Sequence, residues 1–230
     1  MGRLRSGSMG SAERRRVAVL ISGRGSNLAA LIEACRRPEA SAAIVLVIAD
    51  RTDAGGLDHA RAAGIPAQVV ARGDYASRSQ FEAALEDRLR EHAVELICLA
   101  GFMRILSADF VARWRDRLLN IHPSLLPAFR GLDTHRRAIE AGVRIAGCSV
   151  HFVRAEVDAG PIIIQGALAV RPDDTPESLA ARVLEIEHRC YPLALELVAS
   201  GRARVEGERV VIDGARTPDA VLINPMGLAG

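Results

Sequence analysis

An asparagine and a histidine stand two positions apart at the end of the apolar stretch 118–122, and a proline follows directly. Residues two positions apart in a strand point to the same side, so Asn120 and His122 share a face. A histidine can give or take a proton near neutral pH, and an asparagine amide can donate to a developing oxyanion. Pro123 keeps the chain extended at His122 and ends the strand. A lone histidine there could be purely structural, but the asparagine beside it favours catalysis.

A glycine-rich turn, GRGSNL at 23–28, joins the first apolar stretch to a segment with helical spacing. Backbone N–H groups at a helix N-terminus favour a phosphate, and Ser26 or Asn27 would add side-chain donors. The glycines also fit the first two positions of the dinucleotide fingerprint G-x-G-x-x-G, but Leu28 stands at the third. The turn therefore indicates a single phosphate, with tight packing of strand on helix as the alternative.

Two further loops carry residues that could contact a ligand. The segment GFMRIL (101–106) places apolar side chains around Arg104 and could wall a planar ligand, unless it is a turn of the core. The segment RAEVDAGPI (154–162) holds Asp158, a potential partner for a histidine, although turn hydrogen bonds could equally explain it. The motifs H-E-x-x-H, G-x-S-x-G and Walker A are absent from the sequence.

Apolar stretches alternate with segments of helical spacing along the chain. We expect strands at 16–23, 42–50, 67–71, 94–102, 117–122, 145–153 and 161–170, followed by a helix at 175–201 and a hairpin at 203–212. Ser77 is a candidate N-cap of a helix at 77–92, and Thr175, with Pro176 after it, is the expected N-cap of the last helix. Continuous Val/Ile/Leu strands are typical of a parallel sheet covered on both faces. The last two strands are linked too closely for a crossover and must be antiparallel. This predicts one Rossmann-like α/β domain of three layers, with a mostly parallel seven-stranded sheet and one antiparallel strand.

The candidate residues converge in this fold. Open α/β sheets bind ligands beyond the carboxyl ends of their strands, where loops 23–27, 101–104 and 120–132 all lie. Loop 154–160 joins them if the sixth strand runs parallel to the fifth. A phosphate anchor, an apolar wall and an Asn/His/Asp set indicate polar bond-making on a small phosphorylated substrate.

Composition narrows the class of protein. The chain has 230 residues, a net charge of +2 and 3% aromatic residues, which argues against a nucleic-acid partner. The sequence has no run of 18 apolar residues, so we expect no membrane-spanning helix. The four cysteines are widely spaced without a C-x-x-C pair, which favours a reducing compartment over disulfides or zinc. We expect a disordered arm at 1–15, one domain at 16–215 and a tail at 216–230.

Five segments, VLISGRGSNL, LAGFMRIL, LLNIHPSLLPAFRGLDTH, SVHFV and DAGPIIIQ, together resemble the phosphoribosylglycinamide formyltransferase family. The resemblance runs from about Val17 to Ile212. Members of that family transfer the formyl group of 10-formyltetrahydrofolate to the amine of glycinamide ribonucleotide in purine biosynthesis. The resemblance implies a formyltransferase fold, small-molecule partners only, no metal, a cytoplasmic location and a monomer or homodimer.

The resemblance also implies roles for matching residues. Asn120, His122 and Asp158 would be the catalytic set. The ribonucleotide would bind to Gly25, Ser26, Asn27, Gly101, Pro123 and Glu187. The folate would bind to Arg78, Phe102, Met103, Arg104, Ile105, Leu106, Asn120, Val153, Arg154, Ala155, Glu156, Val157 and Asp158. Ala159 stands where the family often has glycine.

Three alternatives remain. Methionyl-tRNA formyltransferase resembles this core but normally adds a C-terminal nucleic-acid-binding domain, whereas only a short segment follows the last long helix here. Formyltetrahydrofolate deformylase normally adds an N-terminal regulatory domain, and only a short arm precedes the first strand. The GLDTH segment at 131–135 also favours the glycinamide enzyme. A nucleotide sensor, the alternative from another class, has no need of an Asn/His pair with an acid.

Overall fold

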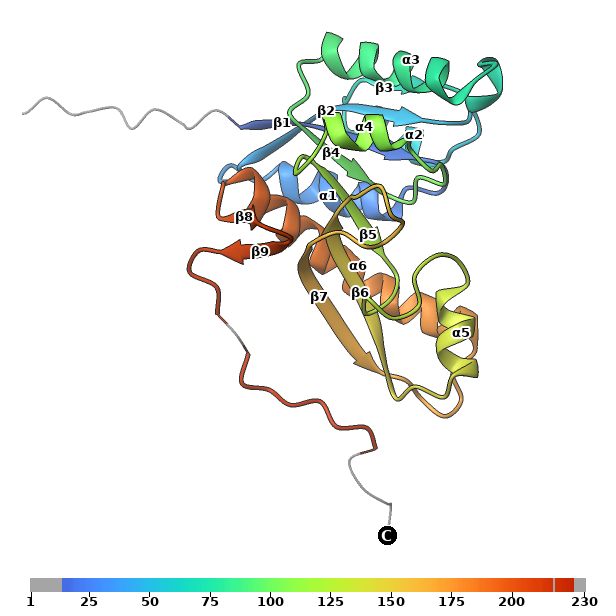
Figure 1. Ribbon diagram of the computed structural model, residues 1–230, viewed down its shortest axis with the longest axis vertical. Helices are drawn as coiled ribbons and strands as arrows, with labels where there is room; N and C mark the ends of the chain where they lie inside the picture. Colours follow the sequence, from blue (N-terminus) through green and yellow to red (C-terminus); the bar gives the residue numbers. More distant parts are fainter. Residues whose placement is uncertain (1–13, 217, 226–230) are drawn as a thin grey trace, which may run out of the picture.

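The computed structural model describes residues 14–216 and 218–225. Within them, seven strands form one sheet in the order β3-β2-β1-β4-β5-β6-β7 (Figure 1). The strands are β1 (Arg15–Ile21), β2 (Ala42–Ala49), β3 (Ala67–Val69), β4 (Leu96–Leu99), β5 (Leu118–His122), β6 (Ile145–Phe152) and β7 (Ile162–Ala169). Neighbouring strands are parallel except where β6 pairs with β5 and β7. The predicted mostly parallel sheet with one reversed strand is confirmed.

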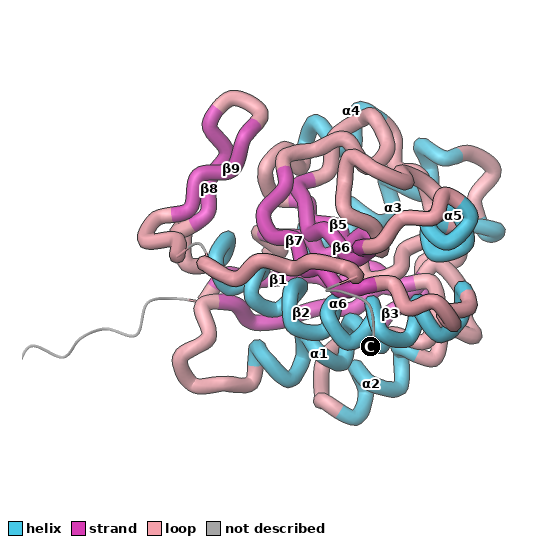
Figure 2. The backbone as a smooth tube through the Cα atoms, turned by 90° about the horizontal axis from the view of Figure 1, so that it is seen from below, coloured by secondary structure: helices cyan, strands magenta, loops and turns pink. Residues whose placement is uncertain are grey.

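Helices cover both faces of this sheet. They are α1 (Ser26–Cys35), α2 (Gly56–Ala62), α3 (Arg78–Glu91), α4 (Ala108–Arg113), α5 (Thr134–Glu140) and α6 (Pro176–Ala199), with a 3-10 turn at Arg72–Asp74. A hairpin of β8 (Ala203–Glu206) and β9 (Arg209–Ile212) follows α6. Figure 2 shows α1 and α2 on the opposite side of the sheet from α3 and α4, which gives the three predicted layers.

The alternation of side chains along the central strands divides the core in two. In β1, Val17, Val19 and Ile21 pack in the cluster that includes residues of α1 and α6. Ala18 and Leu20 pack in the cluster that includes residues of α3 and α4. All five side chains are fully buried. The strand is apolar throughout because each of its faces meets a layer of helices.

The same alternation brings polar side chains together on one face of β5 and β6. Leu119 and Ile121 belong to the core beneath α6, so Asn120 and His122 point to the other side of the sheet. The antiparallel register places His151 of β6 beside Asn120. The loops 123–132 and 153–160, which contact these side chains, cover this face. A polar surface thus lies inside the domain, beneath loops.

The direction of β6 corrects one expectation. Loop 154–160 was expected at the ligand-binding edge on condition that strand six ran parallel to strand five, but β6 is antiparallel to β5 and ends at Phe152. The loop reaches the site by folding back beside β5 (Figure 1). It is closed by a 2.9 Å hydrogen bond from the Phe152 N–H to the Pro161 carbonyl. Gly160 permits this closure, because a Cβ there would lie 1.7 Å from the Phe152 carbonyl oxygen.

Local predictions hold for the helix caps. Ser77 caps α3 by accepting from the Gln80 N–H, and Thr175 caps α6, with Pro176 in its first turn. All four cysteines are free thiols. No helix in the described part of the chain is both long enough and apolar enough to cross a membrane.

The two ends of the chain are described only in part. Strand β1 begins at Arg15, inside the expected N-terminal arm, and residues 1–13 lie outside the described residues. In the tail, residues 217 and 226–230 lie outside them as well. The Asn224 side-chain amide donates to the carbonyls of Arg144 and Val170, at 2.7 and 2.9 Å. These bonds attach the described part of the tail to the ends of β6 and β7.

We predict that Tyr191→Phe lowers the free energy of unfolding by about 1–2 kcal/mol, without changing the fold. The Tyr191 hydroxyl is fully buried on α6 and lies 3.0 and 3.2 Å from the carbonyl oxygens of Leu99 and Leu119, on the neighbouring strands β4 and β5. Its removal leaves those buried carbonyls short of a donor. Urea unfolding measures the difference. The control is Tyr75→Phe, whose hydroxyl has no hydrogen bond among the described residues, and an equal loss in both variants would contradict this account.

Candidate active site

The centre of the polar face is a histidine between two acceptors. His122 is 5% exposed. Its Nδ1 lies 3.3 Å from Oδ2 of Asp158, and its Nε2 lies 3.0 Å from the carbonyl oxygen of Phe129. A carbonyl oxygen only accepts, so Nε2 carries the proton in the contact with Phe129, and Nδ1 faces the carboxylate of Asp158.

Asp158 is the carboxylate that faces Nδ1 of His122. Burial by itself raises the pKa of Asp158, but His151, the Gly131 N–H and His122 outweigh that effect, and the net pKa lies below its ordinary value. The Gly131 N–H donates to Oδ2 at 2.9 Å. Asp158 is therefore ionised at neutral pH and presents a negative charge to His122.

His151 completes this cluster, and the sequence analysis did not assign it a role. Its Nδ1 donates to the Phe152 carbonyl at 2.9 Å, and its Nε2 lies 3.3 Å from the Asn120 amide nitrogen and 3.7 Å from Asp158 Oδ1. In this arrangement His151 Nε2 accepts from Asn120 and orients its amide. A signal was present in the sequence, because Ser149 and His151 alternate with apolar residues in β6 and so share one face.

The glycine-rich turn forms the expected start of α1. Gly25 precedes the helix with a φ of +77°, and a Cβ there would lie 2.5 Å from the Cα of Gly56. Only glycine fits both conditions without strain. The turn thus exposes the first N–H groups of α1, which have no partner within the helix, to the space above the sheet.

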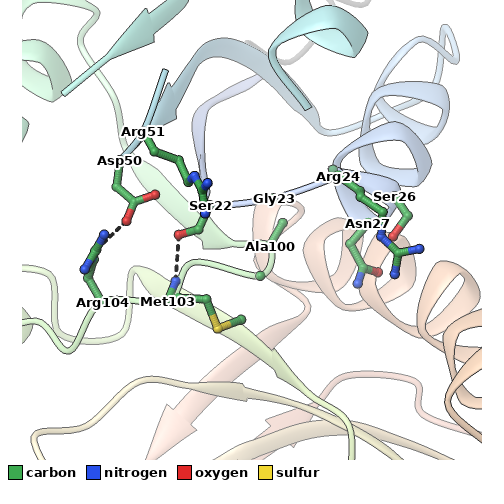
Figure 3. Close-up of a pocket in the computed structure, with 12 residues that line it drawn as sticks. Ser22, Gly23, Arg24, Ser26, Asn27, Asp50, Arg51, Ala100, Met103 and Arg104 are labelled. Carbon is green, nitrogen blue, oxygen red and sulfur yellow. Dashed lines mark hydrogen bonds and ion pairs between the residues drawn. The ribbon is translucent and has the colours of Figure 1, made fainter. Parts of the chain in front are cut away.

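This space is a pocket of about 340 Å³ at the carboxyl ends of β1, β2 and β4 (Figure 3). It is lined by Ser22, Gly23, Arg24, Gly25, Ser26, Asn27, Asp50, Arg51, Ala100, Gly101, Met103 and Arg104. Ser22 joins the loops, since its hydroxyl accepts from the Met103 N–H at 2.8 Å. The predicted phosphate turn and part of the predicted apolar wall therefore share one pocket, as expected.

A buried aspartate that the sequence analysis missed lies on the opposite side of the pocket from Asn27. The Asp50 side chain is fully buried and forms an ion pair with the Nε of Arg104 (Figure 3). Its Oδ1 has no hydrogen-bond partner among the described residues. The Arg104 side chain thus contacts the residue that follows β2. A polar residue at the carboxyl end of a buried parallel strand was the signal for Asp50.

Glu187 of α6 joins the site through Asn27. The Asn27 Nδ2 donates to Glu187 Oε2 at 2.7 Å, and both side chains are buried. Burial raises the pKa of Glu187, and the hydrogen bond from Asn27 offsets this only in part. The Asn27 amide nitrogen therefore faces α6, so the backbone and Ser26 are the remaining donors of the turn.

The residues expected around a folate are only partly brought together. Met103 and Ile105 are 66% and 69% exposed, whereas Leu106 is buried and Phe102 and Val153 pack against the core. Ala155 and Val157 are exposed on the loop after β6, and Pro123 is half-buried beside His122. Arg78 lies in a separate pocket, with Ser107 and Arg113.

Two charged residues of this set bind to other parts of the chain. The Arg154 guanidinium pairs with Asp116 and with Glu208, at 2.7 and 2.9 Å, so it points toward the β8–β9 hairpin. Glu156 pairs with Arg130 at 2.5 Å across the two covering loops. Both contacts hold the loop that carries Asp158, and neither side chain is free to face a ligand in this conformation.

Chemically, the face offers an amide donor and an imidazole side by side. An amide donor and a protonated imidazole stabilise an oxyanion that forms during attack on a carbonyl carbon. The imidazole and the nearby carboxylate can also move a proton between two reacting atoms. The adjoining pocket presents a helix N-terminus, where an anionic group is favoured. This set fits acyl-type transfer to a small phosphorylated acceptor.

Comparisons with known proteins agree with this chemistry. The family model described as formyl transferase matches residues 15–195. The chain is 43% identical to phosphoribosylglycinamide formyltransferase of Escherichia coli over 88% of this chain and 95% of that protein. It is 54% identical to trifunctional purine biosynthetic protein adenosine-3 of Gallus gallus over 83% of this chain, but it spans only 19% of that protein's length. The crystal structure of glycinamide ribonucleotide transformylase 1 from Symbiobacterium toebii superposes with a TM-score of 0.85 and 49% identity, covering 88% of this chain and 95% of that one.

We predict that Glu187→Gln makes the ligand-free protein more stable at neutral pH. A carboxyl whose pKa is raised above 4.5 on folding binds its proton more tightly in the folded protein. Its contribution to stability is present below its unfolded pKa and is lost as the pH rises through the raised folded pKa. The glutamine variant lacks this loss, so its thermal midpoint should exceed that of the wild type increasingly as the pH rises from 4.5 to neutrality.

Thermal unfolding over that pH range checks the prediction. Glu185→Gln, an exposed substitution on the same helix, is the matched control and should follow the wild type. Parallel curves for Glu187→Gln and the wild type would show that Glu187 is not a source of pH-dependent instability.

Proposed function

The chain belongs to the formyl transferase family, and from this membership we propose that it transfers the formyl group of 10-formyltetrahydrofolate to the amine of glycinamide ribonucleotide. The products are formyl-glycinamide ribonucleotide and tetrahydrofolate, in the purine pathway. The observation that carries the proposal is the buried His122–Asp158 pair beside Asn120, next to a pocket formed by a phosphate-type turn. The near-complete coverage of the Escherichia coli enzyme supports it.

We assign the ribonucleotide to the pocket above β1 and β4. Its phosphate would bind to the N–H groups of Gly25, Ser26 and Asn27, where the helix dipole favours an anion. Glu187, held by Asn27, would accept from the ribose hydroxyls. Gly101 and Pro123 would line the path of the glycinamide arm toward His122.

The formyl donor is assigned to the side of the site formed by the segment 102–106 and the loop 153–158. The exposed side chains of Met103, Ile105 and Val157 provide apolar surface for its ring system. Arg104 and Arg78 would contribute positive charge for its anionic tail. In this conformation the Arg154 and Glu156 side chains are engaged elsewhere, so the loop would contact the donor mainly through its backbone.

The proposed reaction needs an oxyanion stabiliser and a route for one proton. The neutral amine attacks the formyl carbon, and negative charge develops on the formyl oxygen. The Asn120 amide would donate to that oxygen, and a protonated His122 would stabilise it by its charge. Asp158 can relay the amine proton, directly or through water, to the folate nitrogen that leaves. These steps need no metal, and we expect none.

Other properties follow from the same assignment. We expect the protein to act in the cytoplasm on these two small molecules, without nucleic acid or membrane as partner. We expect it to be a monomer or a homodimer. The alternative activities are hydrolysis of the formyl donor and binding of a nucleotide without turnover, and the assay below separates them.

We predict that Asn120→Ala and His122→Ala each lower kcat by a factor of about 10² or more, because each removes a group that stabilises the oxyanion. Steady-state kinetics with both substrates measures the effect. His92→Ala, at the C-cap of α3 and outside this cluster, is the control and should keep the wild-type rate. Near-normal rates in both site variants would contradict the proposed roles.

We also predict that the purified protein consumes 10-formyltetrahydrofolate only when glycinamide ribonucleotide is present. The physical reason is that the attacking group is the substrate amine, with water excluded from the buried His122. The absorbance change of the folate, followed with and without the ribonucleotide, measures this. Consumption without the ribonucleotide would indicate a deformylase, and nucleotide binding without any consumption would indicate a sensor.

A further inference from the structure

The loop that covers His122 contacts the site through its backbone. The Phe129 carbonyl accepts from His122 Nε2 at 3.0 Å, and the Gly131 N–H donates to Asp158 Oδ2 at 2.9 Å. The segment 129–133 thus contributes one acceptor to the histidine and one donor to its partner carboxylate. Any displacement of this segment alters both members of the pair.

The segment adopts a conformation that its residues do not favour alone. Phe129 and Asp133 have φ values of +52° and +56°, in the left-handed region, which is uncommon for residues other than glycine. Gly131, between them, has a φ of +79°. Such backbone is costly and persists only where surrounding contacts hold it. Something outside the segment must therefore fix it.

The Arg137 side chain, on α5, provides that contact. Its Nη1 donates to the carbonyls of Arg130 and Leu132, at 2.6 and 3.2 Å. Its guanidinium lies over the Phe129 ring, 5.6 Å from the ring centre. One side chain thus contacts three residues of the segment, on both sides of Gly131. Hydrogen bonds from a charged donor are stronger than neutral ones, and the planar group also stacks on the ring.

We propose that Arg137 is a positioning residue for the catalytic pair, acting through the segment 129–133 on His122 and Asp158. It does not touch the reacting atoms. By clamping the strained loop it keeps the Phe129 carbonyl on His122 and the Gly131 N–H on Asp158. The effect on turnover rests on the proposed function, whereas the effect on the loop does not.

The neighbouring arginine provides a matched control. Arg136 precedes Arg137 on α5 and is also exposed, but it has no hydrogen bond or ion pair within the described part of the chain. Arg136→Ala removes the same charge from the same helix turn without touching the loop. A third variant, Arg137→Lys, keeps the charge and a donor but loses the planar fork.

The experiment measures two quantities on the full chain for wild type, Arg137→Ala, Arg137→Lys and Arg136→Ala. The first is kcat and both KM values for formyl transfer. The second is amide hydrogen exchange of the peptide spanning 125–133. In Arg137→Ala we expect kcat to fall by about tenfold to a hundredfold, as for a small misplacement of catalytic groups, with KM for the ribonucleotide unchanged. Exchange of the peptide should accelerate, Arg137→Lys should be intermediate, and Arg136→Ala should match the wild type.

Two results would overturn the proposal. One is equal kcat and equal exchange in Arg137→Ala and Arg136→Ala. The other is a loss of kcat in Arg137→Ala that accompanies faster exchange across the whole chain, because that shows general destabilisation. If the wild type transfers no formyl group, the proposed function fails. The exchange of 125–133 still decides whether Arg137 clamps the loop.

Discussion

His122 is almost completely buried between the carboxylate of Asp158 and the carbonyl of Phe129. Buried polar groups are costly unless they are hydrogen-bonded or paired, so both acceptors must be held in position. The surrounding contacts meet this need: the Gly131 N–H donates to Asp158, and the Arg130–Glu156 ion pair joins the loops that carry the two acceptors. Much of this half of the domain supports one buried histidine–aspartate pair.

The reversed strand creates the room for this pair. Parallel neighbours need a crossover, which usually lays a helix on the face of the sheet. Because β6 is antiparallel to both β5 and β7, its short link to β7 needs no helix, and loops cover the face that carries Asn120 and His122. Loops can change conformation more readily than a packed helix layer, and their backbone groups are available to the site. The opposite face keeps its apolar packing under α6.

The adjoining pocket follows the same rule that buried polar groups need partners. The loops after β1 and β4 are joined through Ser22, Asp50 is paired with Arg104, and Glu187 with Asn27. Asp50 and Asn27 each retain one oxygen with no partner among the described residues. Groups held in this way cost stability in the ligand-free protein, and a ligand that supplies donors would remove that cost. A binding site is where such a cost is expected.

Several local features could be predicted from the sequence. Period-two alternation placed Asn120 and His122 on one face, glycines marked the turn before α1, and Ser77 and Thr175 marked helix starts, because these depend on nearby residues alone. Only the tertiary structure showed that β6 is antiparallel to β5 and that Asp158 lies beside His122. It also added His151 and Asp50 to the site and paired Arg154 with Glu208. These contacts join residues far apart in the chain, and their geometry depends on the path of the whole sheet. Spacing along a sequence specifies which side chains share a strand face, but only packing specifies which strands and loops meet across it.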